Sequence, residues 1–286
     1  MADIRPMNFG EILDGALMIY RRHFGLFLKL ALVALSVPVV LLVYFGARFL
    51  TGFATMAPDF GALASLIPVA IVYYLASLVL TAGTVRIISD SYLGRTPRLQ
   101  DALALGLSKI WSLAAVGLGK VVVLSLIAAG GGVIVAVLAA MAKGMGALAG
   151  LLIFAVVVAC AWFVIFVACG YGVTTPVVVL EDLRSGFDAF GRSWELTRSF
   201  KGKVLGLAVV AILLTNTLPS LVLRGLGSVA VRSVPALGLV LTALGYIVPL
   251  ILTPVFAAVI TLMYYDFRVR REAFDLQVLG QRLGII

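Results

Sequence analysis

Few side chains in this sequence could take part in catalysis. His23 is its only histidine and follows two arginines beside a long apolar run, where we expect an interfacial polar residue, with pH sensing as the alternative. Cys160 and Cys169 are nine residues apart on one predicted helix, too far to bridge, and neither has metal-ligating neighbours. No zinc-protease, paired-cysteine or phosphate-loop motif occurs. We therefore predict no enzymatic activity, no metal and no cofactor.

The clearest grouping of functional side chains is basic residues beside aromatic ones, at the expected membrane boundaries. The set consists of Arg21, Arg22, Arg192, Trp194, Arg198, Lys201, Lys203, Arg268, Arg270 and Arg271. Bases beside aromatics suit anionic lipid head groups, although they could simply fix topology and depth. Acidic residues such as Glu181, Glu195 and Asp266 are interleaved with them. Attraction to lipid does not require acids, so they favour ion pairs between surface helices or a docking face for a cytoplasmic or membrane protein. Nucleic acid is not an expected partner.

Two polar residues, Lys120 and Asn216, interrupt long apolar runs. Polar groups inside a membrane are costly and are often functional, so these two residues mark the intramembrane site that a transporter would need. The alternatives are that Lys120 extends to the membrane boundary and that Asn216 links two helices.

The elements that must position these residues are membrane-spanning helices. Hydrophobic residues make up 63% of the chain and charged residues 12%, against about 25% charged in soluble domains. Six apolar runs are long enough to span a bilayer. They cover residues 24–47, 62–85, 110–141, 147–171, 204–223 and 237–265. We predict an all-α polytopic protein, one integral-membrane domain over residues 1–286. The third run is longer than a bilayer requires, so segment 110–120 lies either in the membrane or on its surface.

The distribution of positive charge predicts the topology. All but four of the 22 Lys and Arg residues fall on the side of the two termini, and the four exceptions are Arg48, Lys143, Arg224 and Arg232. This asymmetry follows the positive-inside rule, which places both termini in the cytoplasm.

Each pair of spans is preceded by a charged segment with the periodicity of an amphipathic helix. The first has Asn8 and Glu11 as a capping pair, and the second starts with a Thr96-Pro97 cap. The third lies within residues 174–203, where one face would carry Leu180, Leu183, Phe187, Phe190 and Trp194. On this helix we predict the ion pairs Asp188–Arg192 and Glu195–Arg198.

The three charged segments also suggest an internal repeat. Asp14, Asp101 and Asp188 are 87 residues apart. The predicted repeats are residues 1–86, 87–172 and 173–265, followed by a charged cytoplasmic tail, 266–286, and each repeat consists of a surface helix and a membrane hairpin.

Three segments carry a resemblance to a known family. RPMNFGEILDGALMIYRRHF at 5–24, GFDAFGRSWELTRSFKGKVLGL at 186–207 and YYDFRVRREAFDLQ at 264–277 resemble the signature segments of a bacterial integral-membrane family. That family is labelled "glycerophosphoryl diester phosphodiesterase membrane domain". The resemblance spans nearly the whole chain and implies a membrane module in the bacterial cytoplasmic (inner) membrane. Because the catalytic domain is separate from that module, it implies no catalytic residue here.

The sequence therefore predicts a non-enzymatic multi-span inner-membrane protein that organises lipid or a protein partner through its cytoplasmic surface. The alternative is a transporter or permease for a small or lipidic substrate. A membrane-embedded enzyme is the third and weakest hypothesis.

Overall fold

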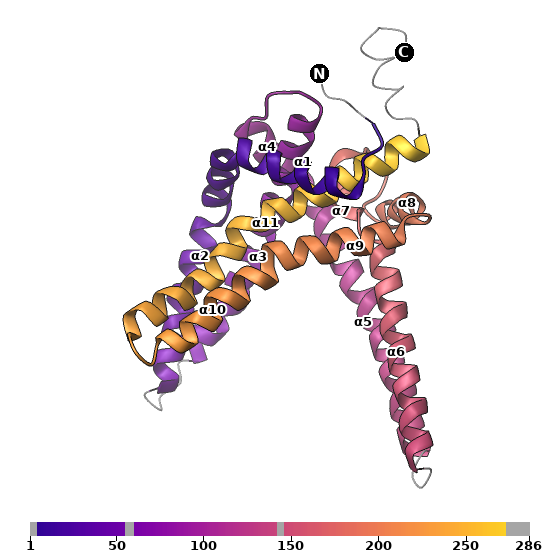
Figure 1. The fold of residues 1–286 in the computed structure, drawn as a ribbon. Coiled ribbons are helices and arrows are strands. Elements are labelled where there is room, and N and C mark those ends of the chain that lie inside the picture. Colours follow the sequence, from indigo (N-terminus) through magenta and orange to yellow (C-terminus); the bar gives the residue numbers. More distant parts are fainter. Residues whose placement is uncertain (1–4, 55–59, 142–145, 273–286) are drawn as a thin grey trace. The chain divides into compact units, whose positions relative to one another are not determined.

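The computed structural model describes residues 5–54, 60–141 and 146–272, and within these ranges it is helical with no strand (Figure 1). The elements are α1 (Phe9–Arg22), α2 (Phe24–Ala54), α3 (Phe60–Tyr92), α4 (Leu99–Ser108), α5 (Ile110–Met141), α6 (Gly146–Gly170), α7 (Thr174–Leu180), α8 (Asp188–Thr197), α9 (Lys201–Ile212), the π-helical turn η1 (Leu213–Thr217), α10 (Leu218–Ala230) and α11 (Pro235–Glu272).

Six helical stretches in the described ranges are long and apolar enough to cross a membrane. They are Phe24–Gly52, Phe60–Tyr92, Ile110–Met141, Gly150–Leu180, Lys201–Ala230 and Pro235–Glu272. The prediction of an all-α polytopic membrane protein is therefore confirmed. The boundaries differ from the apolar runs, because α3 and α11 continue as helices into residues whose charge had suggested a loop and a separate tail.

The chain forms two compact units, described separately here. Unit 1 comprises the residues up to Trp111 together with those from Gly206 onward, and unit 2 comprises Ser112–Leu205. The division into three repeats within a single domain stays a prediction.

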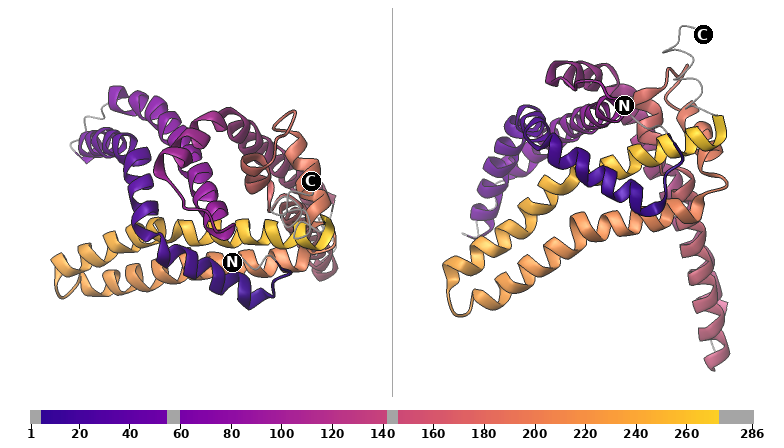
Figure 2. Two further views of the ribbon diagram at one scale, coloured as in Figure 1. Left: turned by 90° about the horizontal axis from the view of Figure 1, so that it is seen from above. Right: turned by 45° about the horizontal axis from the view of Figure 1, so that its top comes forward.

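In unit 1, two helix pairs and two shorter helices pack together. Helix α2 packs on α3, α10 packs on α11, α4 packs on α3, and α1 lies along α11 (Figures 1 and 2). The buried face of α1 consists of Ile12, Ala16 and Ile19, spaced four and three residues apart as helical periodicity requires. The predicted start of α1 is confirmed, because the Asn8 backbone N–H donates to Glu11 Oε2 over 2.7 Å.

Helix α11 has two halves with different surroundings. It has 38 residues and is therefore about 57 Å long, almost twice the ~30 Å of a bilayer core. In its first half, large apolar side chains such as Leu239, Tyr246 and Leu250 are more than half exposed, which suits contact with lipid. From Val255 to Val269 almost every residue is buried. The first half thus has the surface of a lipid-facing helix, and the second half is packed inside the protein.

Helix α3 shows the same division. Its first part exposes Phe60, Ile67 and Ile71, whereas Val79 to Asp90 are largely buried. Together with α1 and α4, the buried ends of α3 and α11 form what we call the packed end of unit 1.

In unit 2, α5 and α6 lie side by side, and a Cβ added to Gly131 would stand 3.0 Å from Cys160 Sγ. Helix α5 continues unbroken through 110–120. It is buried at Leu113, Ala114 and Val116 and exposes apolar side chains from Leu118 onward. By this pattern the lipid-facing part of α5 begins near Leu118.

Two local predictions were wrong. The second short helix starts at Leu99, with Arg98 at the N-cap position, two residues beyond the expected Thr96-Pro97 cap. Segment 174–203 does not carry one continuous apolar face, because its helix stops at Leu180 and α8 starts only at Asp188. The Asp188 carboxylate accepts a hydrogen bond from the Ser185 backbone N–H over 2.9 Å, which stabilises the start of α8 and leaves Phe187 outside the helix, 60% exposed.

Candidate functional site

At the packed end of unit 1, a buried carboxylate joins the segment before α1 to helix α11. Asp266 is fully buried, and its Oδ1 accepts hydrogen bonds from the Met7 backbone N–H over 2.8 Å and from Arg270 Nε over 2.9 Å. The guanidinium of Arg270 also donates to the Met7 carbonyl over 3.1 Å. Both backbone groups of Met7 are thereby bound, so this cluster fixes the segment before α1 to α11.

A second polar contact links α3 to α11 in the same region. The hydroxyls of Ser89 and Tyr265 are 2.7 Å apart, and the Tyr265 ring lies 4.9 Å from that of Tyr92. On α3, Arg86 Nε donates to Asp90 Oδ2 over 2.9 Å. These contacts satisfy the hydroxyls of Ser89 and Tyr265 and one of the two carboxylate oxygens of Asp90 inside a helical core.

The last turn of α1 presents a different environment. Arg21 and Arg22 are exposed, and in the described part of the chain their side chains make no ion pair. They directly precede α2, whose first exposed apolar side chain is Phe24. The Tyr20 hydroxyl donates to the Ile251 carbonyl over 3.1 Å, and burial raises the pKa of this phenol.

His23 lies beside these arginines. Its Nε2 is 3.0 Å from Ser91 Oγ, at the end of α3. Burial, with the neighbouring charge of Arg22 as the second cause, lowers the pKa of His23 below its usual value. The ring therefore links the residue before α2 to the end of α3.

The predicted basic residues of α11 differ from Arg21 and Arg22, because two of them are in ion pairs. Arg268 Nε pairs with Glu272 over 2.9 Å, and its Nη1 donates to the Tyr264 hydroxyl over 3.3 Å. Arg270 is bound to Asp266, and Arg271 is exposed. These contacts of Arg268 thus lie within α11, whereas Arg270 pairs within α11 and also binds the Met7 carbonyl in the segment before α1.

In unit 2, the ion pairs predicted on α8 are wrong in their partners. Arg192 pairs with Glu181 over 3.0 Å and with Glu195 over 3.5 Å. Asp188 instead accepts from the Ser185 backbone N–H in the loop before α8, and Arg198 is exposed at the end of that helix with no ion pair among the described residues. The reason is the break after Leu180, which brings Glu181 back against α8 within reach of Arg192.

Trp194 belongs to an aromatic cluster that holds α8 against the end of α6. Its ring lies 5.8 Å from Phe166 and 5.9 Å from Tyr171, and it packs so closely on Gly170 that a Cβ there would overlap the indole. The Lys201 ammonium stands 3.1 Å from the Phe166 ring centroid and 3.6 Å from the Trp194 centroid, a cation–π arrangement. Lys203, two residues on, is half-buried.

Helix α8 is also fixed by hydrogen bonds. The hydroxyls of Ser193 and Thr197 both donate to the Gly170 carbonyl, over 2.9 and 3.1 Å. Trp194, Arg192 and Lys201 are therefore positioned by packing in unit 2, and of the predicted surface residues there Arg198 alone is seen exposed and without an ion pair in the described chain.

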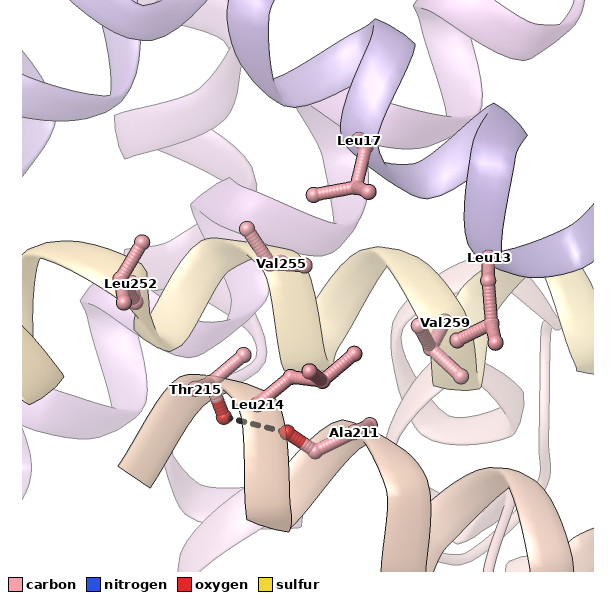
Figure 3. A pocket seen from close by; sticks show the side chains of 8 residues that line it. All are labelled: Leu13, Leu17, Ala211, Leu214, Thr215, Leu252, Val255 and Val259. Carbon is pink, nitrogen blue, oxygen red and sulfur yellow. Dashed lines mark hydrogen bonds between the residues drawn. The ribbon is translucent and has the colours of Figure 1, made fainter. Parts of the chain in front are cut away.

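Unit 1 also contains an apolar cavity that the sequence did not reveal. It has a volume of about 70 Å³ and is formed by α1, by α9 with η1, and by α11. Figure 3 shows its lining side chains: Leu13, Leu17, Ala211, Leu214, Thr215, Leu252, Val255 and Val259. The only hydroxyl among them, that of Thr215, donates to the Ala211 carbonyl over 2.7 Å.

The π-helical turn beside this cavity follows from Pro219. Proline has no N–H to donate to the carbonyl four residues earlier, which is that of Thr215, and its ring crowds that carbonyl. The helix therefore widens over Leu213–Thr217 before α10 continues. Such turns often occur at functional sites.

The two predicted intramembrane polar residues lie in different units. Lys120 is half-buried on α5 in unit 2 and makes no ion pair in the described ranges. Asn216 is exposed on the π-helical turn in unit 1. Among the residues that the structure describes, no group of three or more His, Cys, Asp or Glu side chains could hold a metal ion.

The Asp266–Arg270 spacing of four residues could have indicated an ion pair from sequence. Its third member, Met7, is 259 residues from Asp266, and no local pattern shows that contact. No protein-family model matches this chain, and no curated protein or solved structure matches it. The family resemblance of its three segments stays a prediction.

Proposed function

We propose that this protein is a non-enzymatic module of the bacterial inner membrane, with cytoplasmic termini, that binds anionic lipid head groups and so organises lipid or a protein partner. The supporting observation is which of its arginines are in ion pairs and which are exposed without one. Arg192, Arg268 and Arg270 are in ion pairs, whereas Arg21, Arg22 and Arg198 are exposed and without an ion pair in the described chain.

Exposed bases at a membrane boundary gain from an anionic leaflet. Each contributes about 1 kcal/mol near such a surface, and the contribution falls with added salt. Arg21 and Arg22 have the additional feature of position, because the exposed apolar surface of α2 begins at Phe24 directly after them. A guanidinium at this level can bind a phosphate in a bidentate manner.

Native mass spectrometry of the protein extracted with its lipids tests this proposal. We expect enrichment of phosphatidylglycerol or cardiolipin over phosphatidylethanolamine, and a loss of about fivefold per arginine in Arg21→Gln, Arg22→Gln and Arg198→Gln. Arg232→Gln is the matched control, since this exposed arginine belongs to the connections predicted on the opposite side. Equal retention of anionic and zwitterionic lipid by the wild-type protein would contradict the proposal.

Transport of a small or lipidic substrate is the second candidate, favoured by the π-helical turn that carries Asn216. The double variant Lys120→Leu, Asn216→Leu separates the two functions. Under our proposal this variant retains anionic lipid at the wild-type level. A selective loss of retained ligand in the double variant, with the three arginine variants unchanged, would support the transporter instead.

A further inference from the structure

The cavity beneath α1 has a closed floor and one open edge. Ala211, Thr215, Val255 and Val259 form the floor, and none of them is more than 7% exposed. Leu17 and Leu214 stand at the edge, 36% and 49% exposed. A ligand can therefore enter the cavity between Leu17 and Leu214 and contact the buried side chains of its floor.

The chemistry of the lining excludes water as a stable occupant. A volume of about 70 Å³ could hold a water molecule, but a buried water needs two to four polar partners. Thr215 provides the one polar side chain, and its proton is already donated to the Ala211 carbonyl. A larger apolar cavity, of about 150 Å³, stays dry and takes up hydrocarbon instead.

The open edge continues into surface that suits the membrane interior. Next to Leu214, the exposed side chains are Ile212, Leu213 and Leu218, and across the cavity on α11 they include Leu250 and Ile251. A hydrocarbon chain lying along this surface could place several of its methylene groups in the cavity without leaving an apolar environment.

The charge beside the cavity suits one class of chain-bearing molecule. Arg21 is four residues beyond Leu17, so the two side chains share a face of α1 and lie about 6 Å apart along its axis. Arg22 adjoins it, and both are exposed at the boundary. A molecule with an anionic head group and an acyl chain would meet the arginines and the cavity together.

We propose that the cavity between α1, η1 and α11 binds part of an acyl chain of an anionic phospholipid whose head group lies against Arg21 and Arg22. This inference rests on the proposed lipid-binding function and gives it a defined site. It also gives α1 a role, because Leu13 and Leu17 complete the cavity wall that α9, η1 and α11 alone would leave open (Figure 3).

The experiment uses the full chain in phosphatidylcholine nanodiscs. These contain a small fraction of phosphatidylglycerol with a diazirine in the upper half of one acyl chain, and a parallel set carries the same diazirine on phosphatidylcholine. After illumination, labelled peptides are mapped by mass spectrometry. We expect phosphatidylglycerol to label Leu13–Leu17 and Leu252–Val259, and to do so more strongly than phosphatidylcholine by about fivefold for each arginine engaged.

Two variants test the two halves of the site. Ala211→Phe fills the floor of the cavity and should reduce labelling of these peptides severalfold. The control is Leu221→Phe on α10, where Leu221 is 67% exposed, and it should leave the labelling unchanged. Arg21→Gln with Arg22→Gln should bring labelling by phosphatidylglycerol down to the level of phosphatidylcholine.

The outcomes separate the inference from the function on which it rests. Anionic lipid that is selectively retained but labels peptides away from the cavity would overturn the acyl-chain site and leave the proposed function standing. Equal labelling of the cavity by both lipids would overturn the head-group assignment, and the proposed function falls with it only if the protein also retains anionic and zwitterionic lipid equally. The wild-type map gives either result by itself, so the test does not depend on the folding of Ala211→Phe.

Discussion

Replacing Asp266 offers the most direct test of how the segment before α1 is joined to α11. Its carboxylate is fully buried and receives two hydrogen bonds on one oxygen, from Met7 and from Arg270. Asp266→Asn keeps the size of the side chain and an oxygen that can accept both bonds, but it removes the negative charge. Arg270→Gln leaves the charge and removes its counterion.

The two substitutions should differ in cost because the partners differ in burial. A hydrogen bond to a charged group contributes about 1.5–3 kcal/mol and a neutral one about 0.5–1.5, so losing the charge at two bonds should cost Asp266→Asn about 2 kcal/mol. The Arg270 side chain is 31% exposed and can partly recover its hydration. Arg270→Gln instead removes a charged partner from a fully buried carboxylate, and we expect about 3–4 kcal/mol.

The double variant Asp266→Asn, Arg270→Gln should cost less than the sum of the two single variants by at least ~1 kcal/mol, because it removes both charges together. The free energy of unfolding, measured by denaturant titration in one detergent, provides all three values. Asp14→Asn is the control: this aspartate is exposed on α1, and its replacement should change stability by less than ~0.5 kcal/mol. A smaller loss in Arg270→Gln than in Asp266→Asn would refute the reasoning.

Two further predictions concern other contacts. Gly170→Ala places a methyl group against the Trp194 indole, so we expect thermal unfolding at a lower temperature and a loss of stability of about 1–3 kcal/mol. The control is Gly191→Ala, on α8 with open space around it, which should be neutral or slightly stabilising. Equal stability of the two variants would contradict the packing of Trp194 on Gly170. Burial and the charge of Arg22 lower the pKa of His23 below 6.5, so the unfolded chain takes up a proton before the native one does. The contribution of His23 to the free energy of unfolding should therefore be constant above pH 6.5 and fall as the pH decreases below it. His23→Gln should remove this decline. An unchanged pH profile in the variant would show that other groups cause the decline.

The class of fold could be predicted because its signals are local. A run of apolar residues longer than a bilayer core leaves few alternatives to a membrane helix, and the part of the chain that the structure describes has six such helical stretches. The cap at Asn8 and Glu11 is equally local, since its hydrogen bond joins residues three positions apart. Each of these features is decided by residues that are close together in the sequence.

The ends of the spans could not be predicted for the same reason. Hydropathy cannot distinguish an apolar residue that faces lipid from one inside a protein core, and Val259 and Leu262 on α11 are fully or almost fully buried while Leu239 is 67% exposed. The helix continues through Arg268 and Arg270 because their charges find Glu272 and Asp266 four residues away. The charge of this segment had suggested a cytoplasmic tail separate from the last span, beginning at residue 266.

Whether an arginine is bound within the protein or exposed depends on residues that are distant in the chain. Arg270 and Arg21 have the same sequence context, with bases and aromatics at a membrane boundary, yet Arg270 is bound to Asp266 and to Met7, 263 residues away, whereas Arg21 is exposed. Sequence reasoning therefore grouped together residues that hold the fold and residues that are free to bind a ligand. Only the second kind can account for lipid recognition, and variants of the first kind would lose function through instability. For this reason a test of lipid binding should use Arg21, Arg22 and Arg198, and a test of folding should use Arg270.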